Sequence, residues 1–119
     1  VDMKILSGDG GGLILRGNTT AGNLYYFHVL PDGSYHIYVE KNHQLTTLLG
    51  GGTISSFTTN QRNTLTTIAQ GNQLYFYANE KLLTMLKDST YTNGYMGVLS
   101  ACSTAAADVV YTNAKIWRL

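Results

Sequence analysis

Apolar and polar residues alternate along most of the chain with the period of two that a half-buried β-strand produces. Clusters of turn residues interrupt the alternation every eight to twelve residues or so, the spacing typical of a β-sandwich or barrel. No amphipathic helix of about ten residues interrupts this pattern. The sequence therefore predicts an all-β fold with strands over residues 1–6, 13–16, 24–30, 34–41, 45–49, 64–70, 73–79, 81–87, 94–101 and 108–119.

Two segments determine where strands of this pattern begin and end. Pro31-Asp32-Gly33 lies between two strand patterns, and its Asp-Gly pair predicts a tight hairpin. Residues 81–87 are ambiguous, because their apolar side chains also fit one face of a helix. We interpret this segment as a strand, since it is short and follows Asn79-Glu80 in a hairpin-like position.

Composition indicates a single domain, residues 1–119, with a neutral and hydroxyl-rich surface. Charged residues make up 13% of the chain, about half the usual share. Such surfaces are typical of exported proteins and of proteins that contact sugars or one another, so we expect an extracellular or cell-surface location. The net charge is +1 and the basic residues are scattered, which argues against nucleic acid as a partner. No apolar run is long enough to predict a membrane span.

Several short segments resemble strands of concanavalin-A-like, laminin-G-like jelly-roll domains. They are GGLILR (11–16), NLYYF (23–27), DGSY (32–35), NTL (63–65), LYFYAN (74–79), DSTY (88–91), GYMGV (94–98) and VVYTNAKIW (109–117). The resemblance covers nearly the whole chain and implies a two-layer antiparallel β-sandwich of the lectin kind.

The chain also departs from the family pattern in one respect. Domains of this kind normally carry one or more strands before the segment that corresponds to Val1. If such strands are lacking here, the sandwich has an open sheet edge, which exposes unpaired backbone groups and invites strand addition. The sequence thus also predicts a possible homo-oligomer formed through edge strands.

Acidic residues are not arranged for glycoside hydrolysis. No predicted strand holds two acids at i, i+2 or i+4, the arrangement expected for a carboxylate pair across a scissile bond. Glu40 stands alone in its strand, and Asp88 occupies the position of a structural turn acid in the family. No phosphate-binding loop or nucleophile elbow is present. We predict that the protein is not an enzyme; a hydrolase would have to depend on Glu40 or Asp88.

No cofactor is predicted. Asp9, Asp32 and Asp108 are candidate loop ligands for Ca²⁺, but Asp before Gly is also good turn chemistry, and we favour that interpretation. The only cysteine, Cys102, excludes an internal disulfide, and its place at the end of a predicted strand suggests a buried thiol.

The alternation leaves a set of aromatic and polar side chains on the face opposite the core. If the strands concerned share one sheet, its outer face carries Arg16, Tyr26, His28, His36, Tyr38, Tyr75 and Tyr77. Flat rings with polar tips suit a carbohydrate, because rings stack on the pyranose while hydroxyl and imidazole groups bind its hydroxyls. The same residues suit a protein partner, and tyrosine also simply stabilises sheets. We predict a non-catalytic carbohydrate-binding module, with a self-assembling structural subunit as the alternative. Trp117 is expected in the core.

Overall fold

The computed structural model describes all residues, 1–119, and contains ten β-strands and no helix. The strands are β1 (Asp2–Ser7), β2 (Gly10–Asn18), β3 (Asn23–Val29), β4 (Ser34–Lys41), β5 (Gln44–Thr53), β6 (Asn63–Gln70), β7 (Gln73–Ala78), β8 (Lys81–Lys87), β9 (Tyr95–Ala101) and β10 (Asp108–Thr112). The strand interpretation of residues 81–87 is confirmed. No helix has the length and hydropathy needed to cross a membrane.

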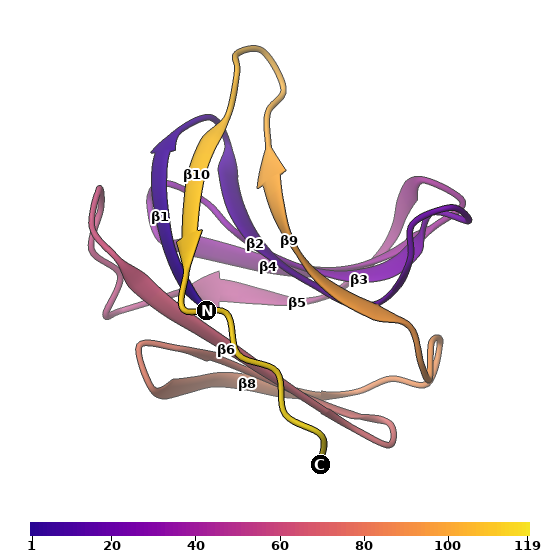
Figure 1. Ribbon diagram of the computed structural model, residues 1–119. Helices are drawn as coiled ribbons and strands as arrows, with labels where there is room; N and C mark the ends of the chain where they lie inside the picture. Colours follow the sequence, from indigo (N-terminus) through magenta and orange to yellow (C-terminus); the bar gives the residue numbers. More distant parts are fainter.

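The strands form two five-stranded antiparallel sheets that face one another (Figure 1). The first sheet has the order β10-β1-β6-β7-β8, and the second has the order β5-β4-β3-β2-β9. The predicted all-β, two-layer sandwich is therefore confirmed. Each sheet combines strands from both halves of the chain, since β10 pairs with β1 and β9 pairs with β2.

The core lies between the sheets and is built from every second residue of the strands. In β3, Tyr25, Phe27 and Val29 are fully buried and alternate with half-buried residues. Phe27 meets Phe76 of β7 edge to face, with ring centroids 5.2 Å apart. Burying each such side chain stabilises the fold by about 1.5–3 kcal/mol, so aromatic contacts of this kind hold the two sheets together.

The hairpin between β3 and β4 has the predicted turn chemistry. Asp32 Oδ1 accepts hydrogen bonds from Ser34 N (2.9 Å) and Ser34 Oγ (2.6 Å). Gly33 has a φ of 83°, which a residue with a Cβ adopts only under strain. The turn fixes the register of β3 against β4, and this register positions the side chains described below.

Three sequence expectations differ from the structure. β5 continues through Gly50, Gly51 and Gly52, although we expect the glycine run to end this strand. The ring of Tyr35 packs 3.2 Å from the position that a Cβ of Gly52 would occupy, so glycine suits this strand. Trp117 was expected in the core and is 71% exposed, because β10 ends before it. Cys102 is exposed in the loop after β9, not buried.

Candidate functional site

The second sheet gathers four of the predicted site residues on its outer face. Tyr26 and His28 project from β3, and His36 and Tyr38 project from β4. They are direct cross-strand partners, Tyr26 with Tyr38 and His28 with His36. All four are half-buried. We call these four residues the tyrosine–histidine face; strand alternation and the Asp32–Gly33 hairpin together explain why they meet.

Glycines flank the histidine pair in the neighbouring strands. Gly12 of β2 lies opposite His28, and Gly51 of β5 lies opposite His36. Because glycine has no side chain, neither imidazole has a cross-strand side-chain neighbour on its outer flank. The ring of His36 is tilted by 34° against that of Tyr38, with centroids 5.7 Å apart. The result is a ring-lined surface open at both sides of the histidines.

Burial shifts the pKa values of His28 and Tyr26 toward their uncharged forms. Burial lowers the pKa of His28, and the carbonyl oxygen of Asp9, 3.1 Å from Nε2, opposes that effect without cancelling it. Since that carbonyl can only accept, Nε2 is the donor, and Nδ1 of the neutral ring is left as an acceptor. Burial raises the pKa of the Tyr26 hydroxyl, and the nearby Glu40 carboxylate raises it further. The face therefore offers aromatic rings, the Tyr26 hydroxyl as a donor and Nδ1 of His28 as an acceptor.

Tyr75 and Tyr77 do not belong to this surface, and the expectation of one shared sheet is wrong for them. Both lie on β7, which is in the first sheet, so they face outward on the opposite side of the sandwich. The Tyr75 hydroxyl donates to Gln73 Oε1 at 3.0 Å. Alternation shows whether a side chain points toward the core or away from it, but it does not show which sheet the strand joins.

Arg16 does not project outward either. The register of β2 against β3 shifts between Leu15 and Asn18, and Arg16 itself has a φ of 49°. This irregularity reverses the alternation, and Arg16 is only 9% exposed. Its guanidinium group donates to the carbonyls of Tyr91 (2.9 Å) and Gly71 (2.6 Å). Arg16 thus joins β2 to the β6–β7 turn and to the loop between β8 and β9.

Two of the acidic residues singled out in the sequence, Asp88 and Asp32, lie in structural positions. Asp88 accepts hydrogen bonds from the Tyr25 hydroxyl and the Thr90 amide, which is the behaviour of a turn acid. Asp32 caps its hairpin, as described above. No group of three or more His, Cys, Asp or Glu side chains is arranged to hold a metal ion. Glu40 lies close enough to Tyr26 to raise the pKa of its hydroxyl, and the predicted set of site residues did not include Glu40.

Comparisons with known proteins give a match among solved structures. No protein-family model matches the sequence, and no curated protein matches it. Among solved structures, the chain is similar to the carbohydrate-binding module CBM66 from Bacillus subtilis, with a TM-score of 0.80. The two share 22% identity over 94% of this chain and 68% of that chain. At this level of identity the likeness shows a shared β-sandwich fold, while membership of the concanavalin-A-like family stays a prediction.

Proposed function

We propose that this protein is a non-catalytic, lectin-like module that binds carbohydrate through the tyrosine–histidine face. The observation that carries the proposal is the direct pairing of two tyrosines and two histidines on one outer sheet surface, with glycine on either flank. The fold supports it, because a protein of the same architecture is a carbohydrate-binding module. An extracellular or cell-surface location is part of the same proposal, in keeping with the sparsely charged surface.

The chemistry of the face favours a neutral sugar. Aromatic rings cover the apolar C–H surfaces of a pyranose or furanose, and the hydroxyl and imidazole groups at the ring edges bind the sugar hydroxyls. Glu40 is the charged side chain beside Tyr26, and a carboxylate there repels uronate or sulfate groups. We therefore expect neutral polysaccharides to bind and anionic ones to bind less well.

The experiment compares two matched tyrosine pairs. Tyr26→Ala/Tyr38→Ala removes the rings of the proposed site, and Tyr75→Ala/Tyr77→Ala removes two half-buried tyrosines from the opposite sheet. Retardation of each variant is measured in native gels that contain neutral polysaccharides, after a glycan array has identified the best ligand. We expect the first variant to lose at least tenfold in affinity, about 1.4 kcal/mol, and the second to bind like the unmodified protein. The proposal is refuted if polysaccharide retards both variants equally, or if only the second variant loses affinity.

One observation favours the alternative of a self-assembling subunit: β6 is paired along only one of its two edges over residues 66–70. An unpaired edge can add a strand from another molecule. Assembly through it predicts a solution mass that rises with protein concentration in analytical ultracentrifugation. The Tyr26→Ala/Tyr38→Ala change leaves that mass untouched, so the two candidate functions are separable.

A further inference from the structure

The outer face of the second sheet carries an apolar row that crosses four strands. Tyr26 and Tyr38 are cross-strand partners, and the row continues to Ile14 of β2 on one side and to Leu48 of β5 on the other. Cross-strand partners project from the same face of a sheet, so all four side chains point away from the core. We call Ile14, Tyr26, Tyr38 and Leu48 the tyrosine row. It extends the tyrosine–histidine face toward both edges of the sheet.

An irregularity in β5 brings Leu48 into the row. The register of β4 against β5 shifts between Ile37, which pairs with Gly50, and Tyr38. Without this shift, Leu49 would be the partner of Tyr38. Instead Leu49 packs against the core, and Leu48 lies opposite Tyr38 with 56% of its surface exposed. The irregularity thus directs a large apolar side chain outward, beside the two tyrosines.

The row is long, and it ends without a large side chain on either side. β5 is an edge strand, so no further strand follows Leu48. At the other end, the cross-strand partner of Ile14 is Gly97 of β9, which has no side chain. Since neighbouring strands lie about 4.8 Å apart, four strands give a row of about 14 Å, room for about three sugar rings end to end.

Polar groups accompany the row along both of its long sides. In β4, the outward-facing residues follow one another as His36, Tyr38 and Glu40. The histidine pair therefore borders the row on one side and Glu40 borders it on the other, close to Tyr26. A ligand lying parallel to the strands would meet imidazole, phenol and carboxylate in turn. A ligand lying across the strands meets apolar surface throughout, with hydrogen-bonding groups on both sides.

We propose that the tyrosine row binds an internal stretch of an extended, neutral polysaccharide chain laid across the strands. This inference rests on the proposed function and adds to it the class of ligand. A sugar chain has the complementary arrangement, because its rings present C–H surfaces along the middle and hydroxyl groups along both edges. A single terminal sugar would cover the tyrosines and leave Leu48 uncovered. Leu48 is therefore the residue that determines specificity for chain length.

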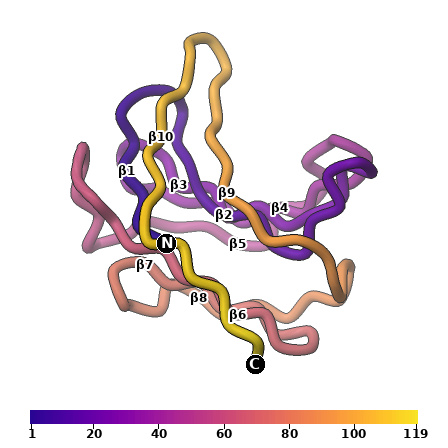
Figure 2. Tube along the Cα trace, viewed as in Figure 1, coloured from indigo at the N-terminus to yellow at the C-terminus, as the bar shows by residue number.

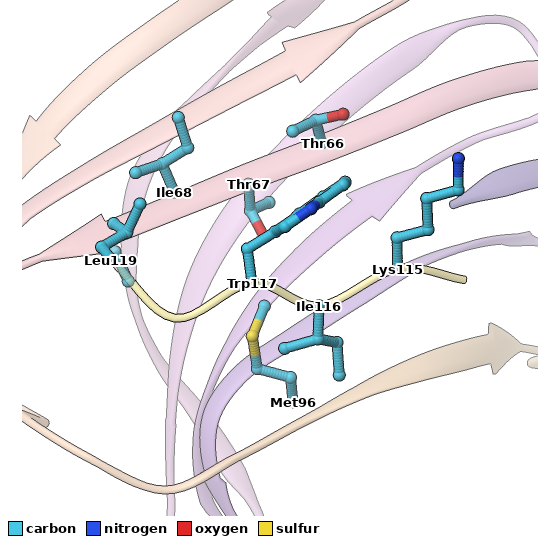
Figure 3. A pocket seen from close by; sticks show the side chains of 9 residues that line it. Thr66, Thr67, Ile68, Met96, Lys115, Ile116, Trp117 and Leu119 are labelled. Carbon is cyan, nitrogen blue, oxygen red and sulfur yellow. The ribbon is translucent and has the colours of Figure 1, made fainter. Parts of the chain in front are cut away.

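A second exposed aromatic surface of the protein provides the control for location. After β10, residues 113–119 cross in front of β6 (Figure 2), and a cavity of 510 Å³ lies between them. Figure 3 shows Trp117 extending from this segment toward Thr66 and Thr67 of β6. An exposed indole is also a platform on which a sugar ring can stack. The variant Trp117→Ala therefore distinguishes this cavity from the tyrosine row.

The experiment shortens the row and varies the length of the ligand. Leu48→Ala removes one end of the row, and Leu82→Ala is its matched control, because Leu82 is 53% exposed on β8 of the first sheet. Oligosaccharides of one to six units, from the neutral glycan that binds best on an array, are titrated calorimetrically into the unmodified protein and each variant. Tyr26→Ala/Tyr38→Ala is included, and thermal unfolding confirms that the leucine variants keep the Tm of the unmodified protein.

We expect the affinity of the unmodified protein to rise at least tenfold from the monosaccharide to the trisaccharide and to level off for longer chains. Leu48→Ala should lower the affinity for the trisaccharide about fivefold, or about 1 kcal/mol. It should leave the affinity for the monosaccharide unchanged. Leu82→Ala and Trp117→Ala should bind every oligosaccharide like the unmodified protein.

The possible failures separate this inference from the proposed function. Equal affinity for monosaccharide and trisaccharide, or equal losses in Leu48→Ala and Leu82→Ala, overturns the inference. The proposed function survives that result if Tyr26→Ala/Tyr38→Ala still abolishes binding. Unchanged binding by Tyr26→Ala/Tyr38→Ala, or a loss confined to Trp117→Ala, overturns both, and the second result would place the sugar in the cavity beside Trp117.

Discussion

Replacing Tyr25 with Phe isolates one buried hydrogen-bond network from the packing around it. The Tyr25 ring is fully buried and meets the ring of Tyr91 edge to face at 5.4 Å. Its hydroxyl donates to Asp88 Oδ1 (2.5 Å) and accepts from the Tyr91 amide (3.0 Å). Phenylalanine keeps the ring and its contacts, so Tyr25→Phe removes only these two hydrogen bonds.

The expected cost follows from the chemistry of the lost bonds. A hydrogen bond to a charged group contributes about 1.5–3 kcal/mol, and an amide left without a partner adds to the loss. Water reaches the half-buried Asp88 and moderates the total, so we expect about 2–3 kcal/mol at pH 7. With an unfolding entropy of about 2.1 cal/mol/K per residue, a chain of this length loses about 4 °C of Tm per kcal/mol. Tyr25→Phe should therefore lower the Tm by about 10 °C.

The pH dependence of this loss tests its origin. Burial raises the pKa of Asp88, but the hydrogen bonds from Tyr25 and Thr90 outweigh burial and leave the pKa below its ordinary value. A group with a lowered folded-state pKa stabilises the fold above its unfolded pKa of about 3.9, and this contribution disappears as the pH falls through the folded value. The difference in Tm between the two proteins should therefore be largest near pH 7 and shrink as the pH falls below the unfolded pKa of Asp88.

Differential scanning calorimetry at pH 7 and pH 2.5 measures both quantities. Asp88→Asn serves as the control, because it removes the charge and keeps an oxygen acceptor, and the double variant completes a thermodynamic cycle. The account expects the two changes to be strongly non-additive at pH 7. A fall in Tm of less than about 2 °C in Tyr25→Phe, or a fall of the same size at both pH values, would show that the hydrogen bond to the Asp88 carboxylate does not stabilise the fold as expected.

Two further predictions concern residues of β2. Arg16→Met keeps the aliphatic stem but removes both guanidinium hydrogen bonds. Urea titration should therefore show that the free energy of unfolding falls by about 2–3 kcal/mol, while the carbohydrate affinity stays unchanged. A loss of carbohydrate binding without a loss of stability would return Arg16 to the ligand site. Gly12→Ala places a Cβ 1.8 Å from the carbonyl oxygen of Phe27. This clash should separate β2 from β3 and lower the Tm by more than about 10 °C. An unchanged Tm would contradict the close approach of these strands.

Much of the fold was predictable from sequence, because its strands alternate regularly and its turns carry Gly, Asn or Asp. The same regularity placed Tyr26 and Tyr38 on the outer face, and the Asp32–Gly33 turn placed His28 opposite His36. These predictions depend only on local rules of strand geometry. Such rules suffice where a hairpin joins the two strands concerned.

The remaining site residues were beyond these rules for two physical reasons. Tyr75 has the alternation of an outward residue, but the sheet that its hairpin joins depends on the long-range pairing of β6 with β1, which the neighbours of Tyr75 in sequence do not encode. Arg16 lies at an irregularity of β2, where a positive φ turns the side chain inward. Trp117 was misplaced for a related reason: its apolar neighbours suggest a strand, yet no strand lies beside residues 113–119 to bury it.

The histidines supply a direct test of where carbohydrate binds. The chain has three: His28 and His36 on the tyrosine–histidine face, and His43 in the turn between β4 and β5. The imidazole proton resonances of all three can be followed by NMR while the best neutral oligosaccharide is added. The account predicts saturable shifts at His28 and His36, with His43 unmoved. Saturable binding that leaves both His28 and His36 unperturbed would contradict the central claim.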